Sequence, residues 1–141
     1  MGGSVAQEGL PEGLVVRASR FGPKETADRL AEAVTARGMA VLARIDHAAA
    51  AEKVGMNLRP TEVLIFGNPK AGTPLMQAAQ TIGIDLPLKA LVWQDEPGRT
   101  WLGTNDPAWL ARRHGIDAEA EAAISAMTAA LAAVAQQATE G

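Results

Sequence analysis

The stretch FGNPKAGTPLM, residues 66–76, has the spacing most suggestive of chemistry in this chain. Gly67 and Gly72 stand five positions apart, as do the two glycines of a phosphate-binding P-loop. In that motif a lysine and then a serine or threonine follow, and these two side chains contact phosphate and Mg²⁺. Here Thr73 and Pro74 occupy those positions, so the sequence argues against a nucleotide site of the P-loop type.

A simpler anion site is consistent with the same stretch. We expect Thr73 to cap a helix and Pro74 to open it, because these residue types favour those positions. Free N–H groups at a helix start attract carboxylates and phosphates, and Lys70 and Asn68 lie close by in the sequence. Alternatively, Thr73 satisfies those N–H groups itself, and the glycines only let the chain turn. The predicted ligand-binding residues are Gly67, Asn68, Lys70, Gly72 and Thr73, with His47 or His114 nearby.

His47 and His114 are the only histidines in the chain. Neither has a His, Asp or Glu four residues away, so the sequence lacks a preformed metal pair of the HExxH kind. A site assembled in space from both histidines and a carboxylate stays open, as does the simpler role of a polar residue at a helix end. We predict no metal and no cofactor. An enzyme that uses His47 or His114 as an acid–base group or metal ligand is an alternative.

Composition narrows the range of functions. The 141 residues suit one domain, and the net charge of -3 argues against nucleic acid as a partner. The absence of cysteine excludes disulfides, thiolate nucleophiles and Cys-bound zinc. We see no signal-peptide pattern and no run that approaches 18 apolar residues, so a cytoplasmic protein without a membrane partner is expected. A signal peptide removed beforehand would leave no trace.

Hydrophobic periodicity predicts the elements that must position these residues. Strands are expected at residues 14–21, 39–46, 62–68, 86–94 and 99–104, and helices at 24–38, 46–55, 74–82, 105–115 and from 117 onward. The turn DEPG should join the last two strands into a hairpin, with Trp93 and Trp101 side by side across it. Because helices alternate with strands, we predict a single-domain α/β sandwich near the α+β border, with a mixed sheet of about five strands.

The chain divides into three predicted segments. Residues 1–13 are Gly-rich and polar and should form a flexible tail, residues 14–116 form the α/β domain, and residues 117–141 form a helix that packs on it. This Ala-rich helix carries one narrow apolar stripe: Ile124, Met127, Leu131 and Val134. Small residues allow another helix to approach closely, so an interaction protein that forms a homodimer through this helix is a further alternative.

The pieces RIDHAAAAEKVGMNLRPTE, FGNPKAGTPLMQ, GIDLPLKALVW and RHGI resemble the bacterial and archaeal family called domain of unknown function 302 (DUF302). The resemblance covers about residues 14–116. It departs at one place, because the family usually carries a tyrosine just before the ND dipeptide, where this chain has Thr104 or its neighbour. The resemblance implies a compact α/β domain that is often dimeric, and it transfers neither an activity nor a catalytic residue.

The family-like motifs fall at the ends of predicted elements, where ligand sites tend to lie. They include Asp46–His47, Arg59–Pro60, the stretch from Gly67 to Pro74, and His114–Gly115. We therefore predict an uncharacterised domain that binds a small molecule, with a small anion as the expected partner.

Overall fold

Five strands form an antiparallel sheet in the order β1-β5-β4-β3-β2. The computed structural model describes residues 9–141 of the chain. The strands are β1 (Leu14–Ser19), β2 (Ala40–Asp46), β3 (Thr61–Gly67), β4 (Leu88–Gln94) and β5 (Thr100–Asn105). The predicted fold class, an α/β sandwich near the α+β border with five strands and a hairpin, is confirmed.

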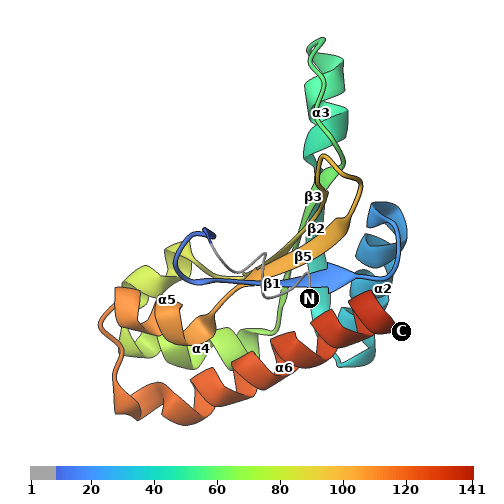
Figure 1. Cartoon of the computed structure of the whole chain (residues 1–141). Helices are drawn as coiled ribbons and strands as arrows, with labels where there is room; N and C mark the ends of the chain where they lie inside the picture. Colours follow the sequence, from blue (N-terminus) through green and yellow to red (C-terminus); the bar gives the residue numbers. More distant parts are fainter. Residues whose placement is uncertain (1–8) are drawn as a thin grey trace.

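The strand directions correct the prediction of a mixed sheet, because every neighbouring pair is antiparallel. A parallel neighbour needs a connection that carries the chain back along the sheet. The connection between β2 and β3 contains only one seven-residue helix, α3 (His47–Lys53). It projects beyond the end of the sheet instead of packing on it, so β3 starts where β2 stops and runs the other way (Figure 1).

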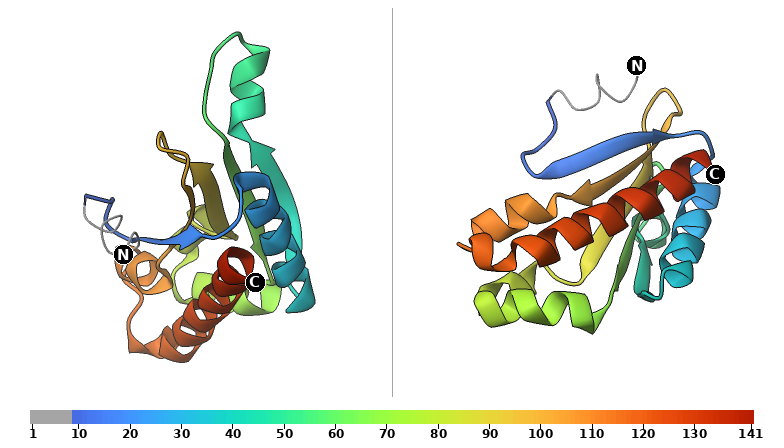
Figure 2. Two further views of the ribbon diagram at one scale, coloured as in Figure 1. Left: turned by 45° about the vertical axis from the view of Figure 1, so that its right-hand side comes forward. Right: turned by 90° about the horizontal axis from the view of Figure 1, so that it is seen from below.

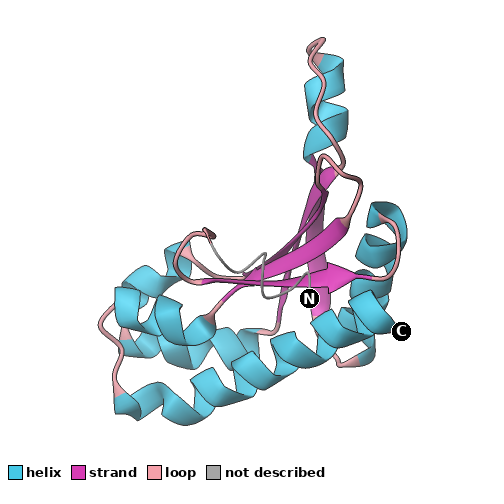
Figure 3. Ribbon diagram, viewed as in Figure 1, coloured by secondary structure: helices cyan, strands magenta, loops and turns pink. Residues whose placement is uncertain are grey.

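Helices lie against one face of this sheet. Figures 1 and 2 show α2, α4 and α6 on that face, and Figure 3 shows α3 standing apart at the end of β2 and β3. The other helices are α2 (Pro23–Ala36), α4 (Pro69–Ala78), α5 (Pro107–Arg113) and α6 (Glu121–Glu140), with short 3-10 turns η1 (Gln80–Ile84) and η2 (Ala118–Ala120).

The core lies between the sheet and the packed pair α2 and α6. Leu30 of α2 and Phe66 of β3 are fully buried, and Leu131 and Val134 of α6 are 4% and 1% exposed. These two residues of α6 belong to the stripe predicted from the sequence. The segment Ala118–Glu140 is long and apolar enough to cross a membrane by length and composition alone. Only 28% of that apolar window is buried inside the protein, and its buried part includes Met127, Leu131 and Val134 of the stripe.

The hairpin of β4 and β5 matches the prediction, with Trp93 directly opposite Trp101. The Nε1–H group of Trp101 donates a 2.8 Å hydrogen bond to Oδ2 of Asp95 in the turn, which holds the pKa of that carboxyl below its ordinary value. Gly103 lets the Trp93 ring lie close, since a Cβ at this position would stand 3.2 Å from the ring. The hairpin is therefore stabilised by the close packing of the Trp93 ring on Gly103, by the pairing of Trp93 with Trp101, and by the hydrogen bond from Trp101 to Asp95.

The start of the described chain is held against α5. The backbone N–H of Asp106 donates to the carbonyl of Gly13 at 2.8 Å. Gly13 has a φ of +86°, and a Cβ there would overlap the ring of Trp109. The first eight residues of the predicted tail lie outside the described residues.

Truncation of Leu30 to alanine should test the importance of the α2–α6–sheet core. Leu30 is fully buried, so Leu30→Ala should lower the free energy of unfolding by about 2–5 kcal/mol in urea denaturation. Ile84→Ala is the matched control, because Ile84 is 75% exposed and its truncation should change that free energy by less than about 0.5 kcal/mol. Equal losses in the two variants would contradict this placement of the core.

Candidate functional site

The helix in the glycine-containing stretch begins earlier than predicted. α4 starts at Pro69, its N-cap is Asn68, and Pro74 lies inside the helix. The side-chain Oδ1 of Asn68 accepts a 2.9 Å hydrogen bond from the backbone N–H of Lys70. The predicted cap at Thr73 is therefore wrong. Both Asn68-Pro69 and Thr73-Pro74 are start signals, and the earlier pair is the one that begins the helix.

The first turn of α4 leaves little for an anion to bind. Pro69 has no N–H group, and the N–H of Lys70 is occupied by the Asn68 side chain. The N–H groups of Ala71 and Gly72 donate to the carbonyl oxygen of Asn68 at 2.9 and 3.2 Å. The helix start thus satisfies itself, as the simpler interpretation of the sequence expected, although through Asn68. A ligand at these residues would have to be held by side chains and surface shape.

Such a surface exists beside the same stretch. A groove of about 780 Å³ runs between α4, the start of β2, residues 86–88 and the first half of α6. The five predicted loop residues all line it: Gly67, Asn68, Lys70, Gly72 and Thr73. The opposite walls come from segments that the sequence did not connect with the loop, residues 37–42 and 123–130. The structure therefore brings the predicted loop residues together in one concave surface.

The lining of the groove is mainly apolar. Its apolar side chains include Met39, Met76, Leu86, Leu88 and Met127. Two cations, Arg37 and Lys70, also line it, and both residues are exposed. Within residues 9–141 no ion pair joins the side chain of either cation to a carboxylate. An apolar cavity with two uncommitted cations is suited to a molecule with an apolar body and an anionic group.

The two histidines lie away from this groove and from each other. His47 begins α3, and His114 follows α5, at a distant end of the molecule in both Figure 1 and Figure 2. A site that combines both histidines is therefore not formed. Among residues 9–141, no group of three His, Asp or Glu side chains could hold a metal ion. Neither histidine lines the groove, although Asp85, the partner of His114, directly precedes the groove residue Leu86.

His114 forms a latch between α5 and η1. Its Nε2 lies 2.5 Å from Oδ2 of Asp85, and its Nδ1 lies 2.9 Å from Oγ1 of Thr81. Arg113 reinforces the latch through hydrogen bonds of 2.8 and 2.9 Å from one guanidinium nitrogen to both Asp85 oxygens. The order Thr–His–Asp is that of a proton relay, but none of the three lines the groove. The latch therefore ties two segments together. Asp85 is one of several carboxylates in the sequence that could pair with a histidine, and the spacing of 29 residues between Asp85 and His114 does not single out this pair.

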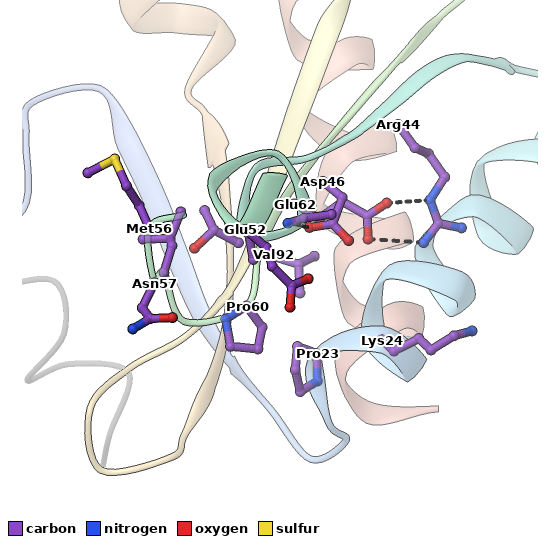
Figure 4. Close-up of a pocket in the computed structure, with 14 residues that line it drawn as sticks. Pro23, Lys24, Arg44, Asp46, Glu52, Met56, Asn57, Pro60, Glu62 and Val92 are labelled. Carbon is purple, nitrogen blue, oxygen red and sulfur yellow. Dashed lines mark hydrogen bonds and ion pairs between the residues drawn. The ribbon is translucent and has the colours of Figure 1, made fainter. Parts of the chain in front are cut away.

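A second, polar cleft of about 560 Å³ lies at the base of α3 (Figure 4). Arg44 of β2 dominates it through bonds of 2.7 and 3.1 Å to the two carboxylate oxygens of Glu62 and one of 3.0 Å to Asp28. The hydrogen bonds that Arg44 donates to Glu62 raise the pKa of Arg44 above its ordinary value, so Arg44 stays charged. Hydrogen bonds from Lys24 and then Arg44 lower the pKa of Asp28. These ion pairs link β2, β3 and α2.

Replacement of Asp85 should loosen the latch. Asp85→Asn removes the charge that Arg113 and His114 share, and it should lower the free energy of unfolding by about 1–2 kcal/mol, since charged hydrogen bonds exceed neutral ones but Arg113 is half exposed. Asp117→Asn is the control, because the Asp117 carboxylate makes no capping hydrogen bond. If urea denaturation gives both variants the wild-type stability, the latch does not contribute as described.

The acidic side of the pH profile offers a test of the Asp28 contacts. Because its pKa in the folded protein is lowered, Asp28 stabilises the fold above its unfolded-state pKa, and this contribution is lost as pH falls through the folded-state pKa. Lys24→Gln should raise the pKa of Asp28, as measured from the carboxyl ¹³C shift by NMR titration. Lys53→Gln, a change in α3 outside these contacts, should leave it unchanged. If the pKa of Asp28 is the same in Lys24→Gln as in the wild type, the hydrogen bond from Lys24 is not the cause of its lowered value.

Comparison with solved structures gives the fold an experimental counterpart. The crystal structure of an uncharacterized conserved protein DUF302 from Bacillus stearothermophilus superposes with a TM-score of 0.80. It shares 22% sequence identity, and the alignment covers 91% of this chain and 99% of that one. The shared architecture therefore extends over nearly the whole of both chains, and at this identity it speaks for the fold.

Curated relatives carry a similar segment inside longer chains. The protein named fluoride-specific ion channel FluC 1 of Brucella suis biovar 1 (strain 1330) is 49% identical over 118 residues, which are 84% of this chain and 46% of the relative. The protein of the same name from Brucella abortus biovar 1 (strain 9-941) matches equally over 44% of its length. This chain thus spans less than half the length of these relatives.

The sequence model of the family described as domain of unknown function DUF302 matches residues 15–134. This match reaches past the predicted domain end at residue 116 and includes most of α6. The departure at Thr104, a residue of β5 that is 8% exposed, does not disturb the strand pairing. The chain belongs to the DUF302 family.

Proposed function

We propose that this domain binds a small amphipathic anion in the groove between α4, β2 and α6. The observation that carries the proposal is an apolar groove with two cations, Arg37 and Lys70, that form no ion pair within residues 9–141. Its volume of about 780 Å³ lies in the range of small-molecule sites. The apolar body of the ligand would contact the groove, and the anionic group would lie near the cations.

The lining favours an organic ligand with some freedom of shape. Met39, Met76 and Met127 have flexible, polarizable side chains that adapt to differently shaped apolar groups. Besides Met127, α6 contributes small residues to the groove, Ala123, Ala126 and Ala130, which leave room beside the helix. A purely inorganic anion would leave these apolar surfaces without a partner. The proposal therefore extends the small anion expected from the sequence to a larger, amphipathic one.

The printed name of the Brucella relatives makes fluoride a ligand to compare. Fluoride has no apolar body, and the self-capped start of α4 offers it no free N–H group from Lys70, Ala71 or Gly72. The match also covers less than half of those relatives. Fluoride therefore enters the experiment below as a competitor to the proposed class of ligand.

The alternatives from the sequence have weaker support. An enzyme based on His114 would use a side chain already bonded to Thr81 and Asp85 and outside both cavities. A homodimer through α6 would use the exposed small residues Ala122 and Ala129, since the apolar stripe of α6 is buried. The homodimer and the cytoplasmic location stay proposals. The exposed alanines of α6 support the first, and the sequence patterns described above support the second.

Thermal unfolding with matched ligands should reveal the preference. Decanoate should raise the midpoint temperature in a concentration-dependent way, because binding to the folded state alone stabilises it. Decyltrimethylammonium has the same alkyl chain with a positive head and should not do so, and neither should acetate or fluoride. Lys70→Gln and Arg37→Gln should each weaken the decanoate response several-fold.

A pair of α6 variants separates the groove from general surface effects. Ala126→Phe should fill the groove and abolish the decanoate response, whereas Ala129→Phe changes an equally exposed alanine that does not line the groove and should preserve it. Calorimetric titration of both variants gives the affinities. The proposal fails if decanoate binds both variants equally, or if acetate or fluoride alone reproduces the wild-type response.

A further inference from the structure

The segment between β2 and β3 forms an arm that stands clear of the rest of the molecule (Figure 1). Its helix, α3, has seven residues and none of them is buried. Asp46 caps it by accepting a 2.9 Å hydrogen bond from the N–H of Ala49. A helix of this length is not stable by itself in water, so the arm depends on its cap and on the paired strands that carry it.

The tip of this arm is apolar. We use arm tip for residues 53–59, in which Val54, Met56 and Leu58 are 72%, 65% and 49% exposed. Gly55, with a φ of +79°, turns the chain at the end of α3 and places these side chains around the turn. Apolar residues gathered at the end of a projecting segment are a mark of an interaction site.

The charges beside these residues indicate the partner. Lys53 and Arg59 flank the three apolar residues in sequence, and within residues 9–141 neither side chain forms an ion pair. Three acidic residues lie nearby, because Met56 and Leu58 also line the cleft at the base of α3 with Asp46, Glu52 and Glu62. Asp46 caps α3 and Glu62 is paired with Arg44, which leaves Glu52 as the acidic side chain on the last turn of α3. Apolar side chains flanked by cations match a bilayer surface, where acyl chains lie beneath anionic headgroups. The geometry points to insertion of the arm tip into an anionic membrane surface.

The shape of the arm favours a lipid surface over a protein partner. The sides of α3 are formed largely by four consecutive alanines, Ala48 to Ala51, which offer little surface for lateral packing. The large apolar side chains lie instead at the end, beyond Lys53. End-on contact with a soft apolar layer covers all three of them, whereas sideways contact with another chain covers mainly alanine.

A single labelled cysteine would detect insertion directly, because the chain contains no cysteine of its own. Met56→Cys carrying an environment-sensitive fluorophore should shift its emission to the blue and brighten with vesicles of three parts phosphatidylcholine to one part phosphatidylglycerol. Vesicles of phosphatidylcholine alone should give a weaker change. The same label at Ile84→Cys, an apolar position that is 75% exposed in η1, should report no change.

Unlabelled variants separate the apolar contribution from the charges. In vesicle flotation, the triple variant Val54→Ser, Met56→Ser and Leu58→Ser should lose most of the bound fraction. Lys53→Gln with Arg59→Gln should reduce binding several-fold and weaken its dependence on salt. Arg112→Gln, an exposed cation on α5, is the matched charge control and should bind like the wild type. Circular dichroism of each variant should show an unchanged fold, since all of these side chains are exposed.

Light scattering distinguishes the competing partner. The inference is overturned if the wild type binds neither kind of vesicle, or if the serine variant floats as well as the wild type. It is also overturned if two results occur together. The first is that light scattering finds the wild type to be a dimer and the serine variant a monomer, and the second is that the fluorescence of the label at position 56 does not change with vesicles. That last result would assign the arm tip to a second copy of the chain.

Discussion

Packing of α6 beside α2 on one face of the sheet is the constraint on which the rest of the structure depends. Leu131, Val134 and Ala138 of this helix are nearly inaccessible, as are Leu30 and Val34 of α2. A two-layer arrangement of this kind covers one sheet face with helices and draws its stability from the apolar area between the layers. The same helix then extends past the core, where its alanines form one wall of the groove. Core and candidate site are therefore parts of one packing arrangement.

Local patterns in the sequence predicted those features that depend on neighbouring residues. The hairpin that pairs Trp93 with Trp101 and the apolar stripe of α6 with Leu131 and Val134 both follow from short-range patterns. The start of α4 was wrong by five residues, because Asn68-Pro69 and Thr73-Pro74 are both sound signals. Tertiary packing decides which of two such signals begins the helix. The hydrophobic periodicity of the sequence does not reveal that packing.

Features that join distant segments lay beyond the sequence. The direction of each strand depends on the path of the connection that precedes it. The projecting arm between β2 and β3 has no distinct periodicity in the sequence, so its path could not be predicted. The pairing of His114 with Asp85 joins residues 29 positions apart. The loop from Gly67 to Thr73 was predicted as part of a site, yet two of the three walls of the groove come from other elements. The loop predicted from the sequence indicates where the site lies. The class of ligand that fits depends on the complete lining of the groove.

The position of α6 after all five strands and α2 in the sequence has a consequence for synthesis. Ribosomes make the sheet and α2 first, so these elements emerge before the helix that covers their apolar surfaces. Until α6 has docked, the groove lacks the part of its lining that Ala126 and Met127 provide. Under the proposed function, ligand recognition would therefore begin only after α6 has been made and has packed on the sheet.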